Sequence, residues 1–455
     1  MKHFISLSSI LILTSCSGLI KKDTKVEHYL EPPNIRIDQY KDTWNLKGKG
    51  PVKLPCGTSC KASELDKYKP EEAAKFSKQG TWEEYIEKEK TGGIKYSVLD
   101  KRGEYVDGKR EGLWKSFYEV ADGQTAPVLR ETPYKNGKKD GIEKKYKEDG
   151  LQIEETTYVD GLMEGPYWQK TRKGLWKLKG RYSNDLEEGK WIEYYAEDAD
   201  LVINNIAHYR AGKKHGAYIS YFKDGKTVQA QGDYTSDAGG YWKVGKWNFY
   251  YESGQLQSSG VYDTQPATDD SGKVKVNPTT NTIISKRIGV WKKFYMNGDI
   301  FFEGALEGNR PNGEWRFYFK GGKLCAFGTM ANEFMMKEGT VYNEDGSLWG
   351  KGVFMTSLIK MNEKEDKIET KFTPGYPFTY YKNGQKYMEI TDEKDDSGKV
   401  VAREYSNSGS VIGKGPIQPL IRKKDGCWEE SGKKVLYRMG SVVTSKIQKK
   451  MFKCE

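Results

Sequence analysis

The sequence predicts an all-β protein: an elongated, twisted antiparallel meander of β-hairpin repeats, with a short helical N-terminal segment and a small C-terminal unit. Aromatic residues make up 13% of the 455 residues and 50 residues are Gly, a composition that favours strands and turns. One phrase, Gly-x-Trp/Tyr-x-x-aromatic-aromatic, also recurs through the middle of the chain. Gly-containing turn dipeptides separate its copies, as in a series of hairpins.

The copies of this phrase set the period of the repeat. Clear copies begin at Gly112, Gly189, Gly216, Gly245, Gly289 and Gly313. Weaker copies begin at Gly141, Gly165 and Gly339. Gly141, Gly165 and Gly189 follow one another at intervals of 24 residues. Because a four-stranded propeller blade needs about 40 residues, a propeller or a closed barrel is the less favoured alternative.

Two turn signals punctuate each repeat. The first follows the aromatic pair and predicts tight primed turns at Asp149-Gly150, Asp224-Gly225, Ser253-Gly254, Asn297-Gly298, Asp345-Gly346 and Asn383-Gly384. The second leads into the next repeat and is Gly-rich, at Asp107-Gly108, Asn136-Gly137, Asp160-Gly161 and Gly212. Each repeat is therefore expected to be strand, tight turn, strand, Gly-rich turn.

The spacing within a repeat assigns aromatic residues to both faces of the sheet. Trp247 and Tyr251 are four residues apart and share one face of a strand, whereas Tyr250 points to the other. The main aromatic positions are a candidate binding surface: Trp114, Trp191, Tyr218, Trp247, Trp291 and Trp315. Such a stripe either packs against neighbouring strands or offers a stacking platform to sugars and other flat ligands. Regular recurrence favours packing.

The N-terminus predicts export. Residues 1–15 read as a signal peptide with the basic Lys2 and a short apolar run, and Leu13-Thr14-Ser15-Cys16 is similar to the lipobox of bacterial lipoproteins. The resemblance implies that Cys16 is lipidated, with palmitate among the acyl chains. Acylation of this kind anchors a protein stably to a membrane. An ordinary signal peptide with a chance Cys is the alternative.

The repeats also resemble a known family. Tyr105 to Trp114 and Tyr209 to Tyr218 look like MORN repeats of the bacterial variant type seen in antitoxin-like proteins and surface lipoproteins. The resemblance covers residues 96–356 and extends as degenerate repeats over 357–415. The chain departs from the pattern in an insertion at 263–286, expected to be a flexible loop.

The flanks of the repeats are expected to differ from them. Residues 16–61, rich in Pro and charge, are predicted to be a lipidated spacer. Residues 62–95 are predicted to hold two short helices. One runs from Pro70 to Gly80, and the other begins at the capping box Thr81-Trp82-Glu83-Glu84 and ends at Lys90. Residues 416–455 form the small C-terminal unit.

Five cysteines remain besides Cys16. Cys56 with Cys60, and Cys427 with Cys454, are possible disulfides, which spacing alone does not decide. That leaves Cys325 as a buried free thiol in a repeat strand. A redox-active Cys56-x-x-x-Cys60 is the less favoured alternative because the spacing is not Cys-x-x-Cys.

Motifs for catalysis are scarce. The chain has no phosphate-binding loop, no Gly-x-Ser-x-Gly elbow and no His-Glu-x-x-His, and it has only four His. His208 and His215 flank a turn but lack Cys partners, so a solvated turn is favoured over a metal site. The net charge of +11 is scattered along the chain and does not indicate nucleic-acid binding. We expect no catalytic residue, no metal and no cofactor.

Together these features predict a lipid-anchored repeat protein of the bacterial cell envelope that is not an enzyme. We expect it at the outer membrane, facing the periplasm or the cell surface. Its partners would be membrane lipid, through the acylated N-terminus, and an envelope or host protein bound by the repeat sheet. Binding of carbohydrate or peptidoglycan by the aromatic face is the alternative. An envelope hydrolase with a site in the C-terminal unit is a third hypothesis.

Overall fold

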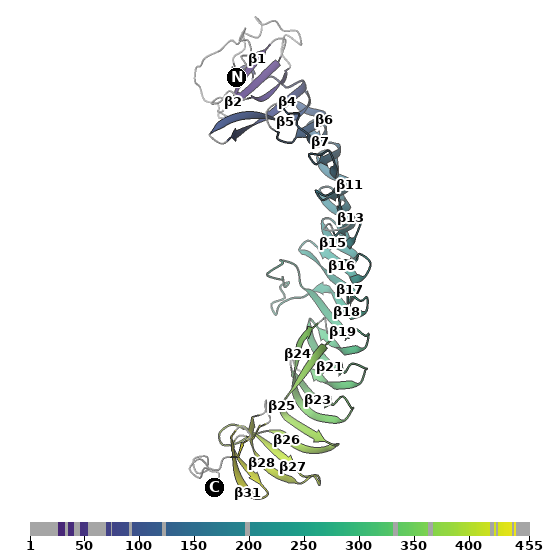
Figure 1. Cartoon of the computed structure of the whole chain (residues 1–455), viewed down its shortest axis with the longest axis vertical. Helices are drawn as coiled ribbons and strands as arrows, with labels where there is room; N and C mark the ends of the chain where they lie inside the picture. The colour runs from purple at the N-terminus through teal and green to yellow at the C-terminus, as the bar shows by residue number, and fades with distance from the viewer. Residues whose placement is uncertain are drawn as a thin grey trace. The chain divides into compact units, whose positions relative to one another are not determined.

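The protein is all-β and divides into two units. The structure, a computed structural model, describes residues 26–31, 35–40, 46–52, 70–73, 75–90, 93–120, 124–195, 201–330, 335–362, 367–418, 423–424, 426–438 and 441–442. Unit 1 comprises Met1–Asn204 with His208–Gly212, and unit 2 comprises Asn205–Ala207 with Lys213–Glu455. Each is an antiparallel meander, and among the described strands no pairing closes either unit into a barrel (Figure 1).

Unit 1 contains the first strands and the one short helix among its described residues. Its strands are β1 (Val26–Glu31), β2 (Ile35–Tyr40), β3 (Leu46–Pro51), β4 (Gly80–Lys90), β5 (Ile94–Val106), β6 (Lys109–Phe117), β7 (Val128–Lys135), β8 (Lys138–Lys139), β9 (Gly141–Tyr146), β10 (Gln152–Val159), β11 (Leu162–Lys170), β12 (Trp176–Ser183) and β13 (Leu186–Tyr194). The helix is α2 (Pro70–Ala73). Each strand pairs with the next except at β8, since β8 and β9 both pair with β7. The strand β14 (Ile203–Arg210) has residues in both units.

Unit 2 continues the same pattern. Its strands are β15 (Lys213–Tyr221), β16 (Val228–Asp237), β17 (Gly240–Tyr250), β18 (Leu256–Pro266), β19 (Ser285–Phe294), β20 (Ile300–Glu307), β21 (Arg310–Tyr318), β22 (Leu324–Met330), β23 (Met335–Tyr342), β24 (Leu348–Asn362), β25 (Lys367–Lys382), β26 (Gln385–Lys394), β27 (Val400–Tyr405), β28 (Val411–Gln418), β29 (Lys423–Lys424), β30 (Gly426–Glu430), β31 (Lys433–Arg438) and β32 (Ser441–Val442). Consecutive strands pair from β15 to β29, and β28 also pairs with β30.

The primed turns occur at the second turn signal. Val106 pairs with Lys109 across a two-residue loop, and both loop residues have positive φ, 47° at Asp107 and 77° at Gly108. Positive φ at both positions defines the type I′ turn, whose twist matches that of the flanking strands. Asn383-Gly384, with φ of 50° and 73°, has the same conformation.

The first turn signal has a different geometry from the predicted one. At Asn297-Gly298 only Gly298 has positive φ, 92°, and its N–H donates to the Tyr295 carbonyl at 3.0 Å. The same bond joins Gly254 to Tyr251 and Gly225 to Phe222, each at 2.9 Å. This is a three-residue loop in which a left-handed Gly follows an ordinary turn. The prediction of tight primed turns was wrong at these three positions, because a single Gly after two ordinary residues suffices for the longer loop. It was correct at Asn383-Gly384, where both residues have positive φ.

The Gly that opens each repeat lies at a β-bulge. Gly245 has a φ of 64°, and the pairing of β16 with β17 shifts between Gln231 and Asp233. A Cβ atom added at Gly245 would meet nothing within 4 Å. Glycine is therefore needed there for its backbone conformation and not for space.

In the repeats whose phrase carries Trp, a second Gly is needed for space. A Cβ atom at Gly232 would lie 2.4 Å from the indole of Trp247, which covers this Gly from the next strand, and Trp247 Nε1 donates to the Asp233 carbonyl at 3.0 Å. We call this arrangement the Trp-on-Gly contact. It recurs as Trp114 on Gly103, Trp191 on Gly180, Trp291 on Gly260 and Trp315 on Gly304. The core of each repeat is thus built between adjacent strands of a single sheet.

Tyrosines connect one Trp-on-Gly contact to the next. Tyr234 packs edge-on against Trp247 with ring centroids 5.1 Å apart, and Tyr262 packs edge-on against Trp291 at 5.2 Å. Tyr251 is buried, and its hydroxyl donates to the Phe294 carbonyl of the following repeat at 2.8 Å. Both Trp247 and Tyr251 are thus buried. Neighbouring repeats are therefore joined by rings as well as by the strand ladder.

Unit 2 also has a layered region. The long hairpin β24–β25 packs over β21, because Phe372 contacts Phe317 with ring centroids 5.7 Å apart and Phe354 at 5.4 Å (Figure 1). Cys325 on β22 is buried within this cluster as a free thiol, as predicted. Burial raises the pKa of its thiol to about 12.

The predicted helices are largely replaced by strand. Residues 81–90 lie in β4, and the helix that begins at Pro70 ends at Ala73. The helix prediction was wrong because Gly80-Thr81-Trp82 is a further copy of the repeat phrase. Gly80 has a φ of 62°, and the buried Trp82 covers Gly50. Glu84, which was expected to cap a helix, accepts hydrogen bonds from Tyr105 and Arg110 at 2.6 and 2.8 Å.

Both flanks hold strands that belong to the meander. Within the predicted spacer 16–61, β1, β2 and β3 pair in order, and β3 pairs with β4. Within the predicted C-terminal unit 416–455, β30 pairs with β28, and Trp428 covers Gly415. Gly426-Cys427-Trp428 is thus another copy of the repeat phrase. The sequence did not reveal that both flanks continue the repeats, because Pro and charged residues between the strands obscured the Gly-x-Trp phrase.

The insertion 263–286 is ordered by its own backbone. Lys275 N–H donates to the Ala267 carbonyl at 2.8 Å, and Ile284 N–H donates to the Lys275 carbonyl at 2.9 Å. Ala267 is buried. Isolated bridges such as Thr268 to Val274 also pair this segment with itself.

The Trp-on-Gly contact generates the first prediction. Trp247→Ala should lower the free energy of unfolding by about 3–5 kcal/mol, because a fully buried indole leaves a cavity. Val290→Ala, at an exposed position of the next repeat, should change it by no more than about 0.5 kcal/mol. Urea unfolding followed by circular dichroism measures both. A loss below about 1 kcal/mol for Trp247→Ala would contradict a core role.

Candidate functional surface

The predicted binding aromatics are core residues. Trp114, Trp191, Trp247, Trp291 and Trp315 are each at most 8% exposed, and Tyr218 is half-buried. Each Trp lies against a Gly of the adjacent strand, so a ring of a ligand has no access to that side of the indole. The favoured interpretation, packing against neighbouring strands, is therefore correct for the Trp residues. The alternative of an exposed platform was wrong because each Trp lies against a Gly of the preceding strand, outside the repeat phrase.

A basic side chain covers most of these core aromatics. In each case the Lys or Arg stands four residues before the aromatic and lies over its ring. The pairs are Lys78 on Trp82, Arg110 on Trp114, Lys214 on Tyr218, Lys243 on Trp247, Arg287 on Trp291 and Lys424 on Trp428. The cation-to-centroid distances run from 4.2 Å for Lys78 to 5.7 Å for Arg287. Cation–π attraction therefore caps the core of the sheet. Sequence reasoning missed this feature, although the constant offset of four residues could have shown it.

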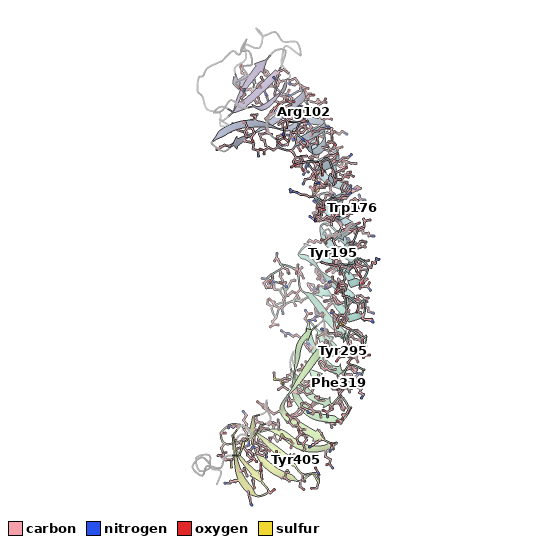
Figure 2. The ribbon with its side chains drawn as sticks, in the orientation of Figure 1. Arg102, Trp176, Tyr195, Tyr295, Phe319 and Tyr405 are labelled. Atoms are coloured by element: carbon pink, nitrogen blue, oxygen red, sulfur yellow. The ribbon has the colours of Figure 1, made fainter. Side chains whose placement is uncertain are left out.

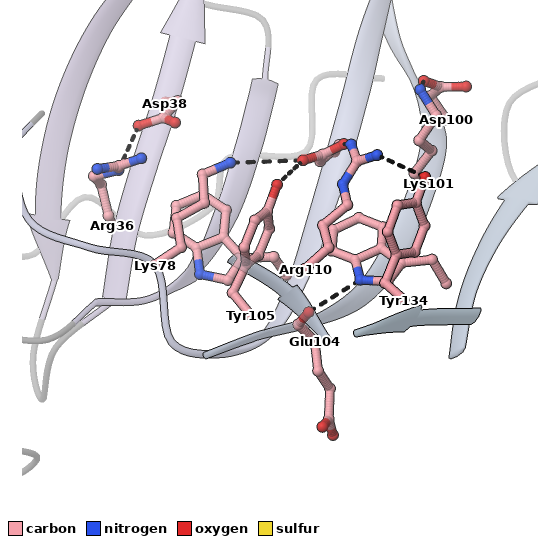
Figure 3. A network of polar contacts seen from close by, with 12 residues as sticks. Arg36, Asp38, Lys78, Asp100, Lys101, Glu104, Tyr105, Arg110 and Tyr134 are labelled. Carbon is pink, nitrogen blue, oxygen red and sulfur yellow. Dashed lines mark hydrogen bonds and ion pairs between the residues drawn. The ribbon is translucent and has the colours of Figure 1, made fainter. Parts of the chain in front are cut away.

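In unit 1 the capping cations share a carboxylate. Lys78, Tyr105 and Arg110 converge on Glu84, with the Lys78 ammonium 3.6 Å away (Figure 3). Burial opposes ionisation of Glu84, but the Tyr105 hydroxyl and the charge of Arg110 outweigh it, so the pKa of Glu84 is lowered. These groups satisfy one another, and their arrangement serves stability.

Lys243 in unit 2 caps the core without such a carboxylate. Its ammonium lies 4.4 Å from the Trp247 ring centroid and 4.8 Å from that of Phe249. Burial, with a smaller contribution from the charge of Lys214, lowers the pKa of Lys243 to about 8. The folded state therefore disfavours the charged form of this side chain.

The face opposite the core is the candidate functional surface, and we call it the open face. It carries the residues directly before and after each core Trp, since side chains alternate along a strand. One row across unit 1 consists of charged residues that pair in register: Glu83, Arg102, Lys115, Glu131, Lys144 and Glu155. Lys115 lies 3.1 Å from Glu131, and Arg102 lies 2.5 Å from Glu83. Most charges of this row are thus neutralised within the sheet.

A second row of the open face is apolar. Leu113 pairs with Pro133, and Ile142 pairs with Thr157, whose hydroxyl donates to the Pro166 carbonyl at 3.0 Å. Pro133 also lies beside the bulge at Gly141, where an added Cβ would be 2.9 Å from it. Leu113 and Ile142 are 50% and 48% exposed. Unit 1 therefore presents an apolar row, defined as Leu113, Pro133, Ile142, Thr157 and Pro166, beside the charged row.

The remaining predicted sites are placed as follows. His215 Nδ1 lies 3.1 Å from the Ser236 hydroxyl. Cys427 is disulfide-bonded, and its partner lies outside the described residues, as do Cys454, Cys56, Cys60 and Cys16. Within the part of the chain that the structure describes, no group of three or more His, Cys, Asp or Glu is placed to hold a metal ion. In the same part, no helix is long and apolar enough to cross a membrane.

Comparison with known proteins supports the repeat assignment. A family model described as "MORN repeat variant" matches residues 243–263, which include Gly245, Trp247 and Gly260. Residues 243–263 are therefore similar to a MORN repeat variant. No curated protein matches the chain.

Two of the matching solved structures are toxin complexes. They are the Photorhabdus luminescens Tc holotoxin pore, at 10% identity over 88% of this chain and 21% of that chain, and TcdB2-TccC3-TEV, at 11% identity over 90% and 22%. Both have a TM-score of 0.16. This chain spans about a fifth of the length of either, and likeness at this level carries no argument about fold or function.

Lys243 generates a prediction about pH. The folded pKa of about 8 lies below the unfolded value, so between these values the unfolded chain binds more protons and stability rises with pH. Lys243→Met removes the buried charge and should be more stable than the wild type at neutral pH. This advantage should shrink as pH rises through about 8 towards 10.

The measurement is urea unfolding of the wild type and the variant across this pH range. Lys246→Met, at an exposed position of the same strand, is the control for loss of a lysine, and at neutral pH it should change the free energy of unfolding by no more than about 0.5 kcal/mol. Parallel stability profiles for wild type and Lys243→Met would show that Lys243 has an ordinary pKa in the folded state.

Proposed function

We propose that the chain is a non-catalytic scaffold that binds a protein partner through the open face of unit 1. The exposed apolar row on β6, β7, β9, β10 and β11 is the observation that carries this proposal. Contiguous apolar surface rimmed by charge is characteristic of protein interaction sites. The Trp residues of the Trp-on-Gly contacts, in contrast, are buried inside the sheet.

The two rows of the open face have different roles in this proposal. Burial of Leu113 and Ile142 by a partner supplies affinity, since about 25 cal/mol is gained for each Å² of apolar surface removed from water. The charged row beside them is already paired within the sheet, as with Lys115 and Glu131. Its contribution is to select a partner with a complementary pattern and to steer its approach.

We also propose that the scaffold is anchored in the bacterial cell envelope through acylated Cys16. The lipobox-like Leu13-Thr14-Ser15-Cys16 supports this proposal. Two or more acyl chains on one residue suffice for stable anchoring. An anchored scaffold would hold its protein partner at the membrane surface.

The apolar row can be tested directly. Leu113→Glu combined with Ile142→Glu should reduce binding of the partner about tenfold without lowering the melting temperature, because both side chains are exposed in the folded state. The partner is first identified by crosslinking the full chain in cells that express it, and binding is then measured with purified proteins.

Val290→Glu is the matched control, since Val290 occupies the same position of a repeat in unit 2 and is also exposed. Its affinity for the partner should be unchanged. If Leu113→Glu with Ile142→Glu binds as well as the wild type, the apolar row is not the interface.

Anchoring has its own test. Cys16→Ser removes the acyl acceptor, so the chain should move from the detergent phase to the aqueous phase in a detergent partition experiment. Ser17→Ala, which leaves Cys16 in place, is the control. Retention of Cys16→Ser in the detergent phase would exclude anchoring through this residue.

A further inference from the structure

The hairpin β11–β12 differs from the rest of the open face in charge. From Lys170 to Arg181, six of twelve residues are Lys or Arg, and none is Asp or Glu. The hairpin also carries Trp168 and Trp176, which are half-buried and are not among the Trp residues that lie against a Gly. This combination of charge and partly exposed aromatics is not a requirement of the repeat.

These side chains form one cluster on the open face. Trp168 and Trp176 pack edge to face with ring centroids 5.4 Å apart. The Lys179 ammonium lies 3.4 Å from the centroid of Trp176, and the Lys170 ammonium lies 4.4 Å from it. Lys179 also lies 5.5 Å from the ring of Tyr194 on β13 (Figure 2 locates Trp176). The indoles thus hold two ammonium groups in defined positions at a half-buried surface.

Among the residues that the structure describes, most cations of the cluster have no carboxylate partner. Lys115 in the same unit lies 3.1 Å from Glu131, and this in-register pairing is the rule in the charged row. Lys179 instead has Trp168 and Ile192 as its cross-strand neighbours. Among the described residues no ion pair includes Lys170, Arg172, Lys173, Lys177 or Lys179, and Arg181 lies 3.8 Å from Glu164.

We propose that the β11–β12 hairpin binds an acidic segment of the protein partner. This inference rests on the proposed scaffold function and adds the chemistry of the partner. Carboxylates from an extended acidic segment would continue the alternation of charge that Trp168 interrupts, each accepting hydrogen bonds from Lys170 or Lys179. Because the indoles already hold these ammonium groups, less side-chain freedom is lost when a carboxylate binds.

The geometry favours carboxylates over a ligand that stacks on the indole. Lys179 and Lys170 lie over the ring of Trp176, where the sugar of a glycan or a nucleic-acid base would have to stack. A ring ligand would need to displace these ammonium groups and lose their cation–π attraction. A carboxylate instead approaches the outer side of each ammonium and leaves the contact with the indole intact.

The test uses the full chain and a fluorescent peptide of alternating Glu and Thr, with fluorescence anisotropy as the readout. The wild type should bind this peptide and should not bind the matching peptide of alternating Gln and Thr. Lys170→Gln combined with Lys179→Gln should weaken binding about tenfold, since two partly exposed ion pairs are lost. Lys115→Gln, which removes a cation already paired within the sheet, should change the affinity less than about twofold.

Three results would overturn the inference. One is no binding of the acidic peptide by the wild type, and another is equal loss of affinity in Lys115→Gln and in the double variant. The third is preference for dextran sulfate, single-stranded DNA or vesicles containing phosphatidylglycerol in competition with the peptide, which would indicate another polyanion.

The result for the acidic-segment inference can be distinguished from the result for the apolar row. In one outcome the wild type and Lys170→Gln with Lys179→Gln bind the identified partner equally well, whereas Leu113→Glu with Ile142→Glu does not bind it. The scaffold function then holds and the acidic-segment inference fails. If the lysine variant loses both peptide and partner but the apolar-row variant does not, the inference holds and the assignment of the interface to the apolar row fails.

Discussion

The structure depends on the contact of a Trp with a Gly on the preceding strand. The indole of Trp247 lies over Gly232, in a space that even one methyl group would fill, and its N–H donates to the Asp233 carbonyl next to the bulge. One side chain thus buries apolar surface and satisfies a backbone acceptor at a bulge. Because each contact joins two adjacent strands, a sheet can form a core without a second layer, and its length is set by the number of repeats.

This way of building a core determines what remains for function. The large aromatics are used on one face together with their capping cations, so the open face is defined by the smaller residues around them. In most repeats these are charged residues that pair across strands, as Lys115 does with Glu131. In unit 1 this cross-strand pairing of charges is interrupted at the apolar row and at the β11–β12 hairpin. Elsewhere in the repeat, side chains are buried or paired within the sheet. A partner would therefore gain most binding free energy at the places where they are not.

Periodicity made much of the fold predictable. The phrase around Gly245 and Trp247 indicated strands, turns and a meander, and the alternation of side chains put Trp247 and Tyr251 on one face. Prediction failed where a second local pattern competed with the repeat. Thr81-Trp82-Glu83-Glu84 resembles a helix cap, although Gly80 and Trp82 are a copy of the phrase. The packing of β24–β25 over β21 could not be predicted, because the contact of Phe372 with Phe317 joins residues far apart in sequence.

Local sequence alone was enough to establish that strands alternate with Gly turns and that each strand has two aromatic faces. Which face is buried was decided only by tertiary structure. The phrase that contains Trp247 does not contain Gly232, so whether its indole is a ligand platform or a core residue depends on the register between strands. The same holds for Lys179, whose cross-strand neighbours Trp168 and Ile192 carry no carboxylate and are not specified by sequence spacing. Burial and pairing are properties of adjacent strands, and adjacency arises only when the sheet has formed.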